Sequence, residues 1–261
     1  MKNYKTLLVE ESNKIVFLTL NRPEKLNAIN ENCLDELMDF FTKINSSEGT
    51  RVIVIRGSGE KAFTAGADIT ELSNAGPEFV EPYNRKWLKV FELIESSSKP
   101  VIASIKGWST GGGTELSVCC DFVICAENSK FGLTEINIGV FPGAGAAVRL
   151  TRLMGRLAAK KVLMLGDFID AKTAIEIGLA SFVVSNESLN DETYKLASKL
   201  SKKAPLAIDA IKKTINYGSE NNLELALEYE LREFLKLFNS EDQKEGMNAF
   251  LQKRKPNFTG K

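Results

Sequence analysis

The 261-residue sequence contains no histidine. This absence excludes Ser-His-Asp and Cys-His nucleophilic sites, HExxH zinc sites and histidine-based facial metal sites. An acid–base reaction near neutral pH would therefore depend on carboxylates, lysine, cysteine or tyrosine. Carboxylates are the strongest candidates, because burial can raise their pKa toward the working pH.

Cysteine is scarce, with four residues in the chain. Cys119 and Cys120 are adjacent, while Cys33 and Cys125 stand alone in apolar surroundings. None forms a CxxC pair, so neither a disulfide framework nor a metal site is expected. Reduced, mostly buried thiols are typical of a cytoplasmic protein, and we expect that location.

The sequence also lacks an excess of either charge and any apolar run of transmembrane length. Lys+Arg and Asp+Glu both number 34, which gives a formal net charge of zero. We therefore expect neither nucleic acid nor membrane as a partner. Residues 1–5 lead directly into a strand-like segment, so no signal peptide is expected. A local basic patch could still hold a phosphorylated small molecule.

Alternating strand and helix patterns predict an α/β fold. Short β-type runs at 6–9 and 15–20, around a polar turn at 10–14, predict a hairpin. Apolar residues at helical spacing predict two helices, one over 34–44 and one over 80–96, and Asn30 is the expected N-cap of the first. Runs without alternation predict strands buried on both faces; they cover 52–55, 101–105 and 122–126.

The segments after Ala144 are mostly helical in pattern. Short helices are predicted at 147–154, 158–165 and 171–177, and three longer ones follow Asn190, the last near 241–252. We therefore expect an α/β core over residues 1–190 and a helical subdomain over 191–261.

Three loops stand out, because each follows a predicted buried strand. They read AFTAGADI at 62–69, GWSTGGGTE at 107–115, and FGLTE at 131–135 followed shortly by FPGAG at 141–145. Loops at the carboxyl ends of buried strands are where α/β proteins build ligand sites.

The glycine triplet Gly111–Gly113 allows the backbone to approach a ligand closely. The pattern that follows predicts an apolar helix starting there, so free N–H groups and the positive end of its dipole would face the loop. Such an arrangement suits an oxyanion, with Glu115 beside it in the first helical turn. Equally, Glu115 could only stabilise the helix N-terminus while the glycines only turn the chain. A phosphate loop and a dinucleotide fingerprint are disfavoured, because neither GxxxxGK[ST] nor GxGxxG occurs here.

Together the loops resemble the crotonase, or enoyl-CoA hydratase/isomerase, superfamily. The matching segments are NRPEKLNAI, KAFTAGADI, KGWSTGGGTELSVCCD, KFGLTEINIGVFPGAGA and EGMNAFLQKRKPNF, spread in order over nearly the whole chain. The resemblance implies a repeated ββα core with a C-terminal helical trimerisation subdomain. It also implies a homotrimer, or a homohexamer formed as a dimer of trimers.

The resemblance further implies an acyl-CoA substrate whose thioester oxygen meets the backbone N–H groups of Ala67 and Gly112. Two such donors suit an enolate. Glu115 and Glu135 match the glutamates on either side of the catalytic water in hydratases, and Gly143 matches a glycine that helps hold this water. Hydratases keep both glutamates, so reversible hydration of a trans-2-enoyl-CoA in fatty acid β-oxidation chemistry is expected. No cofactor is expected beyond the coenzyme A of the substrate.

The coenzyme A contacts implied by the resemblance lie in three segments: Lys25 and Leu26; Ala65, Asp68 and Ile69; and Phe250 and Lys253. The last pair can come from a neighbouring subunit. Asp68 could instead cap its loop, and Lys253 could be a solvated charge of the tail.

Two other functions remain open from the sequence. One is a Δ3-Δ2 isomerase or another enolate enzyme that uses a single glutamate. The other is a non-catalytic acyl-CoA-binding protein, which the retained glutamates and glycine triplet disfavour. The chain departs from many hydratases at Thr134, where proline is common, at Trp108, and at Ala146–Val148 after the PGAG motif. These departures concern substrate identity more than reaction class.

Overall fold

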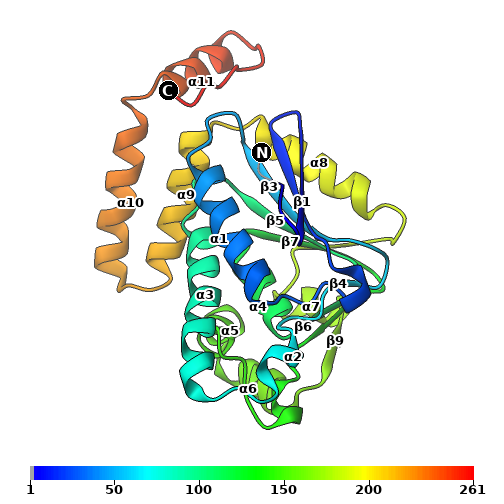
Figure 1. The fold of residues 1–261 in the computed structure, drawn as a ribbon. Coiled ribbons are helices and arrows are strands. Elements are labelled where there is room, and N and C mark those ends of the chain that lie inside the picture. The colour runs from blue at the N-terminus through cyan, green and yellow to red at the C-terminus, as the bar shows by residue number, and fades with distance from the viewer. Residues whose placement is uncertain (1–2) are drawn as a thin grey trace.

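The computed structural model describes residues 3–261; Met1 and Lys2 of the expected N-terminal segment lie outside them. Within this range the chain forms a six-stranded sheet and a four-stranded sheet, surrounded by helices (Figure 1). The strand order of the large sheet is β1-β2-β3-β5-β7-β10, and that of the small sheet is β4-β6-β8-β9. The predicted α/β class is confirmed.

The large sheet is parallel except at its edge, where β1 pairs antiparallel with β2. Its strands are β1 (Leu7–Ser12), β2 (Ile15–Leu20), β3 (Val52–Gly57), β5 (Val101–Ile105), β7 (Phe122–Ala126) and β10 (Phe182–Val184). The hairpin turn is only Asn13-Lys14, both with positive φ, so β1 runs further than expected. Two such residues match the twist of the flanking strands, which leaves Glu10 and Glu11 inside the ladder.

The small sheet receives one short strand after each of three strands of the large sheet. Its members are β4 (Ala62–Thr64), β6 (Trp108–Thr110), β8 (Lys130–Gly132) and β9 (Phe168–Asp170). Helical structure follows each pair, which gives the units β3-β4-α2-α3, β5-β6-α4 and β7-β8-η2-α5. The ββα repeat implied by the family resemblance is therefore present.

The helices that follow these strands form most of the cover. They are α1 (Glu31–Asn45), α2 (Ile69–Leu72), α3 (Pro77–Glu95), α4 (Gly112–Val118), α5 (Ala146–Met154), α6 (Arg156–Leu165) and α7 (Ala171–Glu176). Asn30 caps α1 as predicted, because its side chain accepts a hydrogen bond from the Cys33 N–H at 3.0 Å. Apolar side chains of α1 and α3, including Phe41 and Phe91, fill the main core against the large sheet.

The opposite face of the sheet is covered by α8 (Leu189–Ser201), which spans the expected boundary at residue 190. Leu189 and Ala197 pack there against Val54 and Ile102. This helix therefore shares the core of the sheet, although most of its length belongs to the range expected for the C-terminal subdomain.

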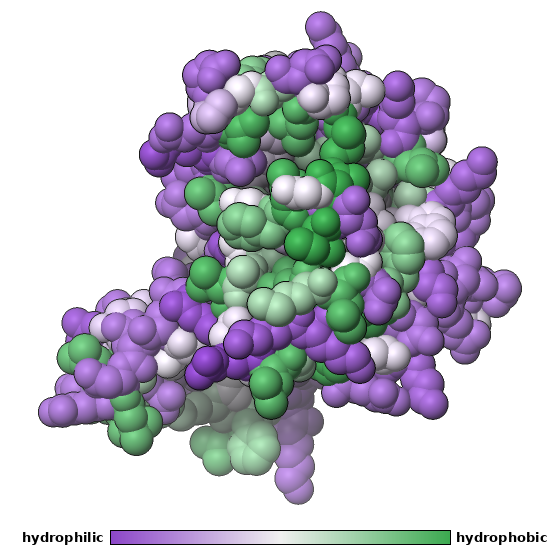
Figure 2. Space-filling view, turned by 90° about the horizontal axis from the view of Figure 1, so that it is seen from below, coloured by the Kyte–Doolittle hydropathy of each residue, from purple (hydrophilic) through white to green (hydrophobic). Residues whose placement is uncertain are grey.

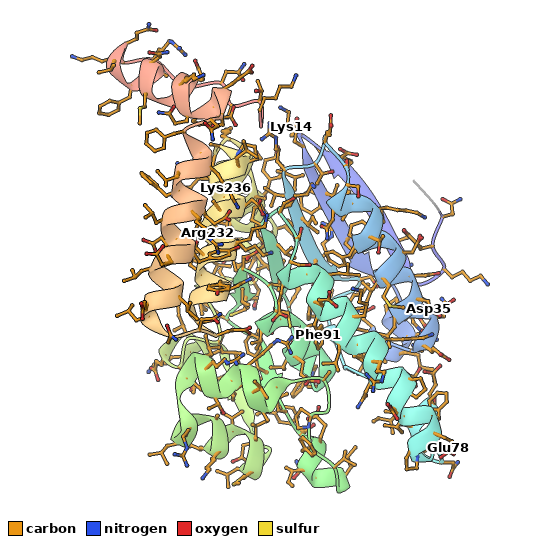
Figure 3. All side chains as sticks on the ribbon, turned by 90° about the vertical axis from the view of Figure 1, so that its left-hand side faces the viewer. Lys14, Asp35, Glu78, Phe91, Arg232 and Lys236 are labelled. Atoms are coloured by element: carbon orange, nitrogen blue, oxygen red, sulfur yellow. The ribbon has the colours of Figure 1, made fainter. Side chains whose placement is uncertain are left out.

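The last three helices form an arm beside the core. They are α9 (Pro205–Gly218), α10 (Leu223–Leu237) and α11 (Glu241–Leu251). The rings of Tyr217 and Tyr229 stack at 4.2 Å between α9 and α10, and Figure 3 shows α10, with Arg232 and Lys236, alongside α9. The ammonium group of Lys212 anchors α9 to the core, because it donates to Ile94 O and Asp121 Oδ2, both at 2.8 Å.

No helix within residues 3–261 is long and apolar enough to cross a membrane.

Candidate active site

Two glycine-containing loops touch at the start of α4. A Cβ on Gly66 would lie 2.5 Å from the Thr110 carbonyl oxygen and 2.8 Å from the Gly112 nitrogen. Gly66 also has φ of +80°, which disfavours a side chain on a second ground. The loop that carries Ala67 and the loop that carries Gly112 are therefore in backbone contact.

The N–H groups of Ala67 and Gly112 are both left without a partner among residues 3–261. Ile29 and Ala67 form an isolated parallel β-bridge, in which Ile29 bonds to the residues on either side of Ala67. The Ile29 N–H donates to Gly66 O, and the Ile29 carbonyl accepts from the Asp68 N–H. The N–H of Ala67 therefore points away from this bridge. Gly112 is the first residue of α4, whose N–H has no acceptor within the helix. Two free donors on touching loops are what an oxyanion requires.

Gly112 itself is held against Trp87 of α3. A Cβ at this position would lie 2.8 Å from the indole ring, so a side chain does not fit without displacing the ring. Gly111, just before it, has φ of +53° and ψ of −125°, and its N–H donates to Gly132 O at 2.8 Å. The triplet is therefore shaped for close packing of the backbone.

Glu115 lies in the first turn of α4 and is only 4% exposed. Its Oε1 accepts hydrogen bonds from the N–H groups of Ala144 and Ala146, at 3.1 and 3.0 Å. Burial raises the pKa of this carboxyl to about 7; Glu135 raises it further, while the two N–H groups oppose the rise. The carboxyl can therefore both hold and release a proton near neutral pH. The alternative, that Glu115 only stabilises its own helix, does not account for these bonds to the turn that opens α5.

Arg149 supports the loop that binds Glu115. Its Nη1 donates to Ala144 O at 3.0 Å, while Nε and Nη2 donate to the two carboxylate oxygens of Glu95 at 2.6 and 2.7 Å. The guanidinium also lies over the Phe91 ring. Arg149 therefore fixes the turn at the start of α5, and its positive charge lowers the pKa of Glu115.

Glu135 begins the short 3-10 helix η2 (Glu135–Ile138) and faces the glycine triplet. Its Oε1 lies 2.9 Å from the position that a Cβ on Gly111 would take. Its Oε2 is buried without a hydrogen-bond partner among residues 3–261. Burial raises the pKa of Glu135 as well. An unpartnered buried carboxyl oxygen favours a role in chemistry over a structural one.

Gly143 lies next to Ala144, and a side chain not foreseen from the sequence lies against it. A Cβ on Gly143 would be 2.6 Å from Nδ2 of Asn84, on α3. No hydrogen bond of the Asn84 amide is found within the part of the chain that the structure describes. The amide is therefore available to a molecule bound beside Gly143.

The predicted coenzyme A contacts near the N-terminus lie around the Ala67 loop. The Ala65 N–H donates to Leu26 O at 2.9 Å, which joins the two segments. Leu26 has φ of +52°, and Leu26 and Ile69 expose their apolar side chains. Lys25, at the end of the 3-10 helix η1 (Pro23–Lys25), is exposed beside them. These residues form one surface next to the free Ala67 donor.

The side chain of Asp68 is engaged within the protein. Its Oδ1 accepts from the Thr70 hydroxyl at 2.7 Å, and its Oδ2 accepts from Arg22 at 3.0 Å. The Thr70 hydrogen bond and the Arg22 charge hold the pKa of Asp68 below its ordinary value. The carboxylate thus caps α2, in agreement with the capping role that the sequence allowed, and only the backbone of Asp68 remains for a ligand.

Phe250 and Lys253 do not join the other residues within one chain. Phe250 lies in the last turn of α11 and Lys253 just after that helix, whereas α2 and α4 lie toward the opposite end of the molecule (Figure 1). Phe250 is 83% exposed. These two residues cannot contact a ligand at the Gly112 site unless another copy of the chain supplies them.

Sequence reasoning missed Asn84, Arg149 and the N–H donors of Ala144 and Ala146. Tyr83 and Trp87 lie on the apolar face of the predicted helix, and Asn84 lies beside them. A polar residue next to this apolar face was the signal that could have identified it. Arg149 is the only charged residue in the stretch 144–151.

Two of the positions that depart from the family pattern can be placed. The Thr134 hydroxyl makes no hydrogen bond to another described residue, and the Trp108 ring packs on the Phe168 ring with centroids 4.8 Å apart.

Comparison with known proteins agrees with this geometry. Residues 10–261 match the family described as enoyl-CoA hydratase/isomerase. The chain belongs to this family. It is 41% identical over 258 residues to the crotonyl-CoA hydratase of Syntrophomonas wolfei, with 99% of each chain covered. It is 36% identical to the short-chain-enoyl-CoA hydratase of Clostridium acetobutylicum, with 95% of each covered.

A solved structure extends the similarity to the fold. The enoyl-CoA hydratase of Bacillus anthracis superposes with a TM-score of 0.95 at 36% identity, covering 98% of this chain and all of that one. The crotonase resemblance stated from the sequence is therefore confirmed, and so is the crotonase fold.

Proposed function

We propose that this enzyme of the enoyl-CoA hydratase/isomerase family catalyses the reversible addition of water to a trans-2-enoyl-CoA. The observation that carries the proposal is the pairing of a buried carboxyl, Glu115, with a half-buried one, Glu135, beside two free backbone donors. Family members that shift a double bond need one proton-transferring group. Hydration needs two, one for water and one for Cα, and both are present here.

In the hydration direction, Glu115 accepts a proton from water as the oxygen attacks Cβ. The electron pair of the double bond moves toward the thioester, and the oxygen charge that develops is stabilised by the N–H groups of Ala67 and Gly112. Glu135, protonated at the start, delivers its proton to Cα. Dehydration reverses each step: Glu135 removes the Cα proton, and Glu115 protonates the departing hydroxyl.

The pair works with one proton between its two carboxyls in either direction. Glu115 is buried, Glu135 is half-buried and each has a raised pKa, so ionising both in one pocket is unfavourable. Hydration begins with this proton on Glu135 and dehydration begins with it on Glu115. Burial thus supplies both an acid and a base near neutral pH without histidine.

The substrate lies, in this proposal, with its thioester at Ala67 and Gly112 and its coenzyme A along Leu26, Ala65 and Ile69. Lys25 contributes charge to the phosphates. Phe250 and Lys253 reach the coenzyme from a second copy of the chain. No cofactor enters the reaction apart from the coenzyme A of the substrate.

Assembly into trimers, or into hexamers of paired trimers, is part of the proposal. Its support is the extent of exposed apolar surface. Figure 2 shows apolar residues gathered on the face seen from below, and the exposed apolar side chains near this end include Val140, Phe141, Leu157 and Met164. A second apolar group lies on the arm, and it includes Leu227, Leu231, Phe234 and Phe238. Faces of this kind are normally covered by a partner.

A short straight acyl chain is the substrate we propose to test first, since the Syntrophomonas and Clostridium relatives are named for crotonyl-CoA and for short chains. A cytoplasmic location is also proposed; four free thiols suit a reducing compartment.

The test is a spectrophotometric assay with crotonyl-CoA, followed by loss of the conjugated enoyl thioester chromophore. Conversion to 3-hydroxybutyryl-CoA is expected, together with the reverse reaction from that product. A 3-enoyl-CoA that is converted to its 2-enoyl isomer while crotonyl-CoA is left unhydrated would favour the isomerase alternative instead.

A further inference from the structure

The side chain of Arg22 reaches two residues that border the Ala67 bridge. Its Nη1 donates to Ala28 O at 2.6 Å, and its Nη2 donates to Asp68 Oδ2 at 3.0 Å. The side chains of this ion pair are only 17% and 9% exposed. Asp68 follows Ala67, and Ala28 precedes Ile29, the bridge partner of Ala67. The guanidinium therefore connects the two strands of the bridge from one side.

Two peptide groups lead in series from Arg22 to the free donor of Ala67. The Ala28 carbonyl accepts from Arg22, and the N–H of the same peptide group is that of Ile29. This N–H donates to Gly66 O at 2.7 Å. The Gly66 carbonyl belongs in turn to the peptide group whose N–H is that of Ala67. Because both peptide groups are planar and trans, the C=O and the N–H of each point in opposite directions, so the bond to Gly66 O fixes where the Ala67 N–H points.

The N–H groups on either side of Ala67 are bonded within the protein. That of Gly66 donates to the Thr64 hydroxyl at 3.0 Å, and that of Asp68 donates to Ile29 O at 3.0 Å. The N–H of Ala67 alone lacks a partner among residues 3–261, as described above. The backbone is therefore held on both sides of the one donor that is left for a ligand.

The positive charge of Arg22 strengthens this series of hydrogen bonds. A cation that donates to a carbonyl polarises its peptide group, so the N–H at the other end of that group becomes a better donor. In such chains each bond strengthens the next by about 10–30%. The Ala67 N–H ends the series, and it is thereby better suited to an oxygen that gains negative charge during a reaction.

Asp68 holds the guanidinium in the required place. Its Oδ1 accepts from the Thr70 hydroxyl at 2.7 Å, which leaves Oδ2 for Arg22. An arginine side chain can donate from two nitrogens in a fixed fork, and here one nitrogen takes the carboxylate while the other takes Ala28 O. The single ammonium group of a lysine could not hold both acceptors in this way.

We propose that Arg22 is a positioning residue for the oxyanion donor, which directs and polarises the Ala67 N–H through two peptide groups. The proposal rests on the proposed hydration function, since that function places the thioester oxygen at Ala67. Arg22 touches no reacting atom. Its removal should therefore affect the polarisation of the thioester and the rate more than the binding of coenzyme A.

The direct measurement is the infrared C=O stretch of bound butyryl-CoA that is isotopically labelled at the thioester carbonyl carbon. This saturated ester cannot be hydrated, so it reports hydrogen bonding to the carbonyl without turnover. Bound to the wild type, it should have a lower stretching frequency than in water, because two preorganised donors polarise the carbonyl. Bound to Arg22→Met, its frequency should return toward the value in water.

Kinetics on crotonyl-CoA should show the same effect. Arg22→Met should lower kcat by roughly 10- to 100-fold with little change in KM, which is part of the cost of removing one oxyanion donor. Arg22→Lys should restore part of this loss, because it keeps the charge but not the two-pronged contact with Ala28 and Asp68.

Arg56→Met is the matched control. Arg56, on β3, is also partly buried, and it likewise bonds a carboxylate, that of Glu10, and an uncharged oxygen, the Thr19 hydroxyl. Neither partner belongs to the Ala67 loop. The control should leave both kcat and the C=O frequency of the bound ester unchanged.

Two outcomes would overturn the proposal, and they differ in what else they remove. If Arg22→Met lowers the C=O frequency as fully as the wild type does, Arg22 has a structural role alone and the hydration function is unaffected. If the wild type itself does not lower the frequency, the oxyanion site is overturned together with the role of Arg22. Where Arg22→Met does not fold, Asp68→Asn takes its place: it should weaken the frequency shift in the same direction, and an undiminished shift would reject the proposal.

Discussion

The guanidinium of Arg149 holds both carboxylate oxygens of Glu95 and, with its remaining nitrogen, the carbonyl oxygen of Ala144. Ala144 in turn donates its N–H to Glu115. A cation on α5 is thus connected to the candidate base through one residue. Arg149 touches none of the reacting atoms, so its role is to position Glu115 and to set its pKa.

Arg149→Met should therefore change the pH dependence and not only the rate. Removing the positive charge raises the pKa of Glu115 above about 7, because Arg149 lowers it in the native protein. The pair of glutamates then keeps its single proton to higher pH. The alkaline limb of the plot of kcat/KM against pH therefore shifts to higher pH. We expect kcat to fall about tenfold as the Ala144 turn loosens. A lower rate with an unshifted profile would indicate a structural role alone.

The two glutamates provide the most direct test of the mechanism. Glu115→Gln and Glu135→Gln should each lower kcat by roughly 100- to 10,000-fold while acyl-CoA binding stays nearly intact. Because both act on one water and one enolate, the double variant should be little slower than the worse single variant. Glu127→Gln, an exposed carboxylate elsewhere, serves as the control.

Hydrogen exchange separates the roles of the two glutamates. On a bound saturated acyl-CoA, exchange of the Cα proton with solvent deuterium should persist in Glu115→Gln and collapse in Glu135→Gln. Nearly wild-type hydration by Glu135→Gln would assign that residue to structure, and the single-carboxylate isomerase function would then be preferred.

The burial of Glu115 predicts a cost to stability that depends on pH. Its pKa is about 7 in the folded protein and about 4.3 in an unfolded chain. The folded state binds this proton more tightly, so stability falls as pH rises from about 4.3 to about 7. Glu115→Gln removes the charge. Its free energy of unfolding, relative to that of the wild type, should therefore rise by up to about 3 kcal/mol as the pH increases from 5 to 8. Melting temperatures at both pH values, with Glu127→Gln alongside, measure this gain; an equal gain at both would contradict it.

Asn84 should contribute to the reaction beside Gly143. Its amide has no hydrogen-bond partner within residues 3–261 and lies where the family resemblance places the catalytic water. Asn84→Ala should lower kcat on crotonyl-CoA by about 5- to 10-fold, the effect of losing about one hydrogen bond. Arg85→Ala, the next residue on the exposed side of α3, should have no effect. Faster turnover of longer acyl chains by Asn84→Ala would show that the amide limits chain length instead.

Lys253→Ala should raise KM for the CoA ester more than it lowers kcat, which is the signature of lost ground-state binding. The expected reason is that Lys253 reaches the coenzyme of a second copy. Lys244→Ala, at an exposed residue of α11, the helix that ends just before Lys253, is the matched control. An unchanged KM in Lys253→Ala would remove this residue from the binding site.

Local sequence signals were sufficient for most of the fold. The unalternating run at 52–55 formed a buried strand, Asn30 formed the N-cap of α1, and the glycine triplet opened a helix as predicted. The ends of strands were predicted less accurately. The sequence pattern predicts a strand over 6–9, whereas β1 continues to Ser12, because the turn consists of Asn13 and Lys14 alone.

The site required tertiary information that the sequence does not contain. Glu115 and Glu135 were identified from loops and from the family resemblance, but the donors to Glu115, Ala144 and Ala146, lie 29 and 31 residues further along, just before and at the start of α5. Asn84 reaches Gly143 only because α3 packs beside that loop. The contacts of Phe250 and Lys253 could not be predicted from a single chain, since the coenzyme A that they are proposed to contact is bound in the site of another copy.

The contact between Gly66 and Gly112 also bears on how this scaffold can acquire new reactions. Neither loop has room to shift without the other, so random substitution at these glycines should yield inactive clones almost without exception. Any new activity on an acyl thioester must then inherit the donor pair unchanged. Diversity in a directed-evolution library therefore belongs at Asn84, Thr134 and Glu135, where the ligand surroundings can vary while the two backbone donors proposed to stabilise the enolate are kept.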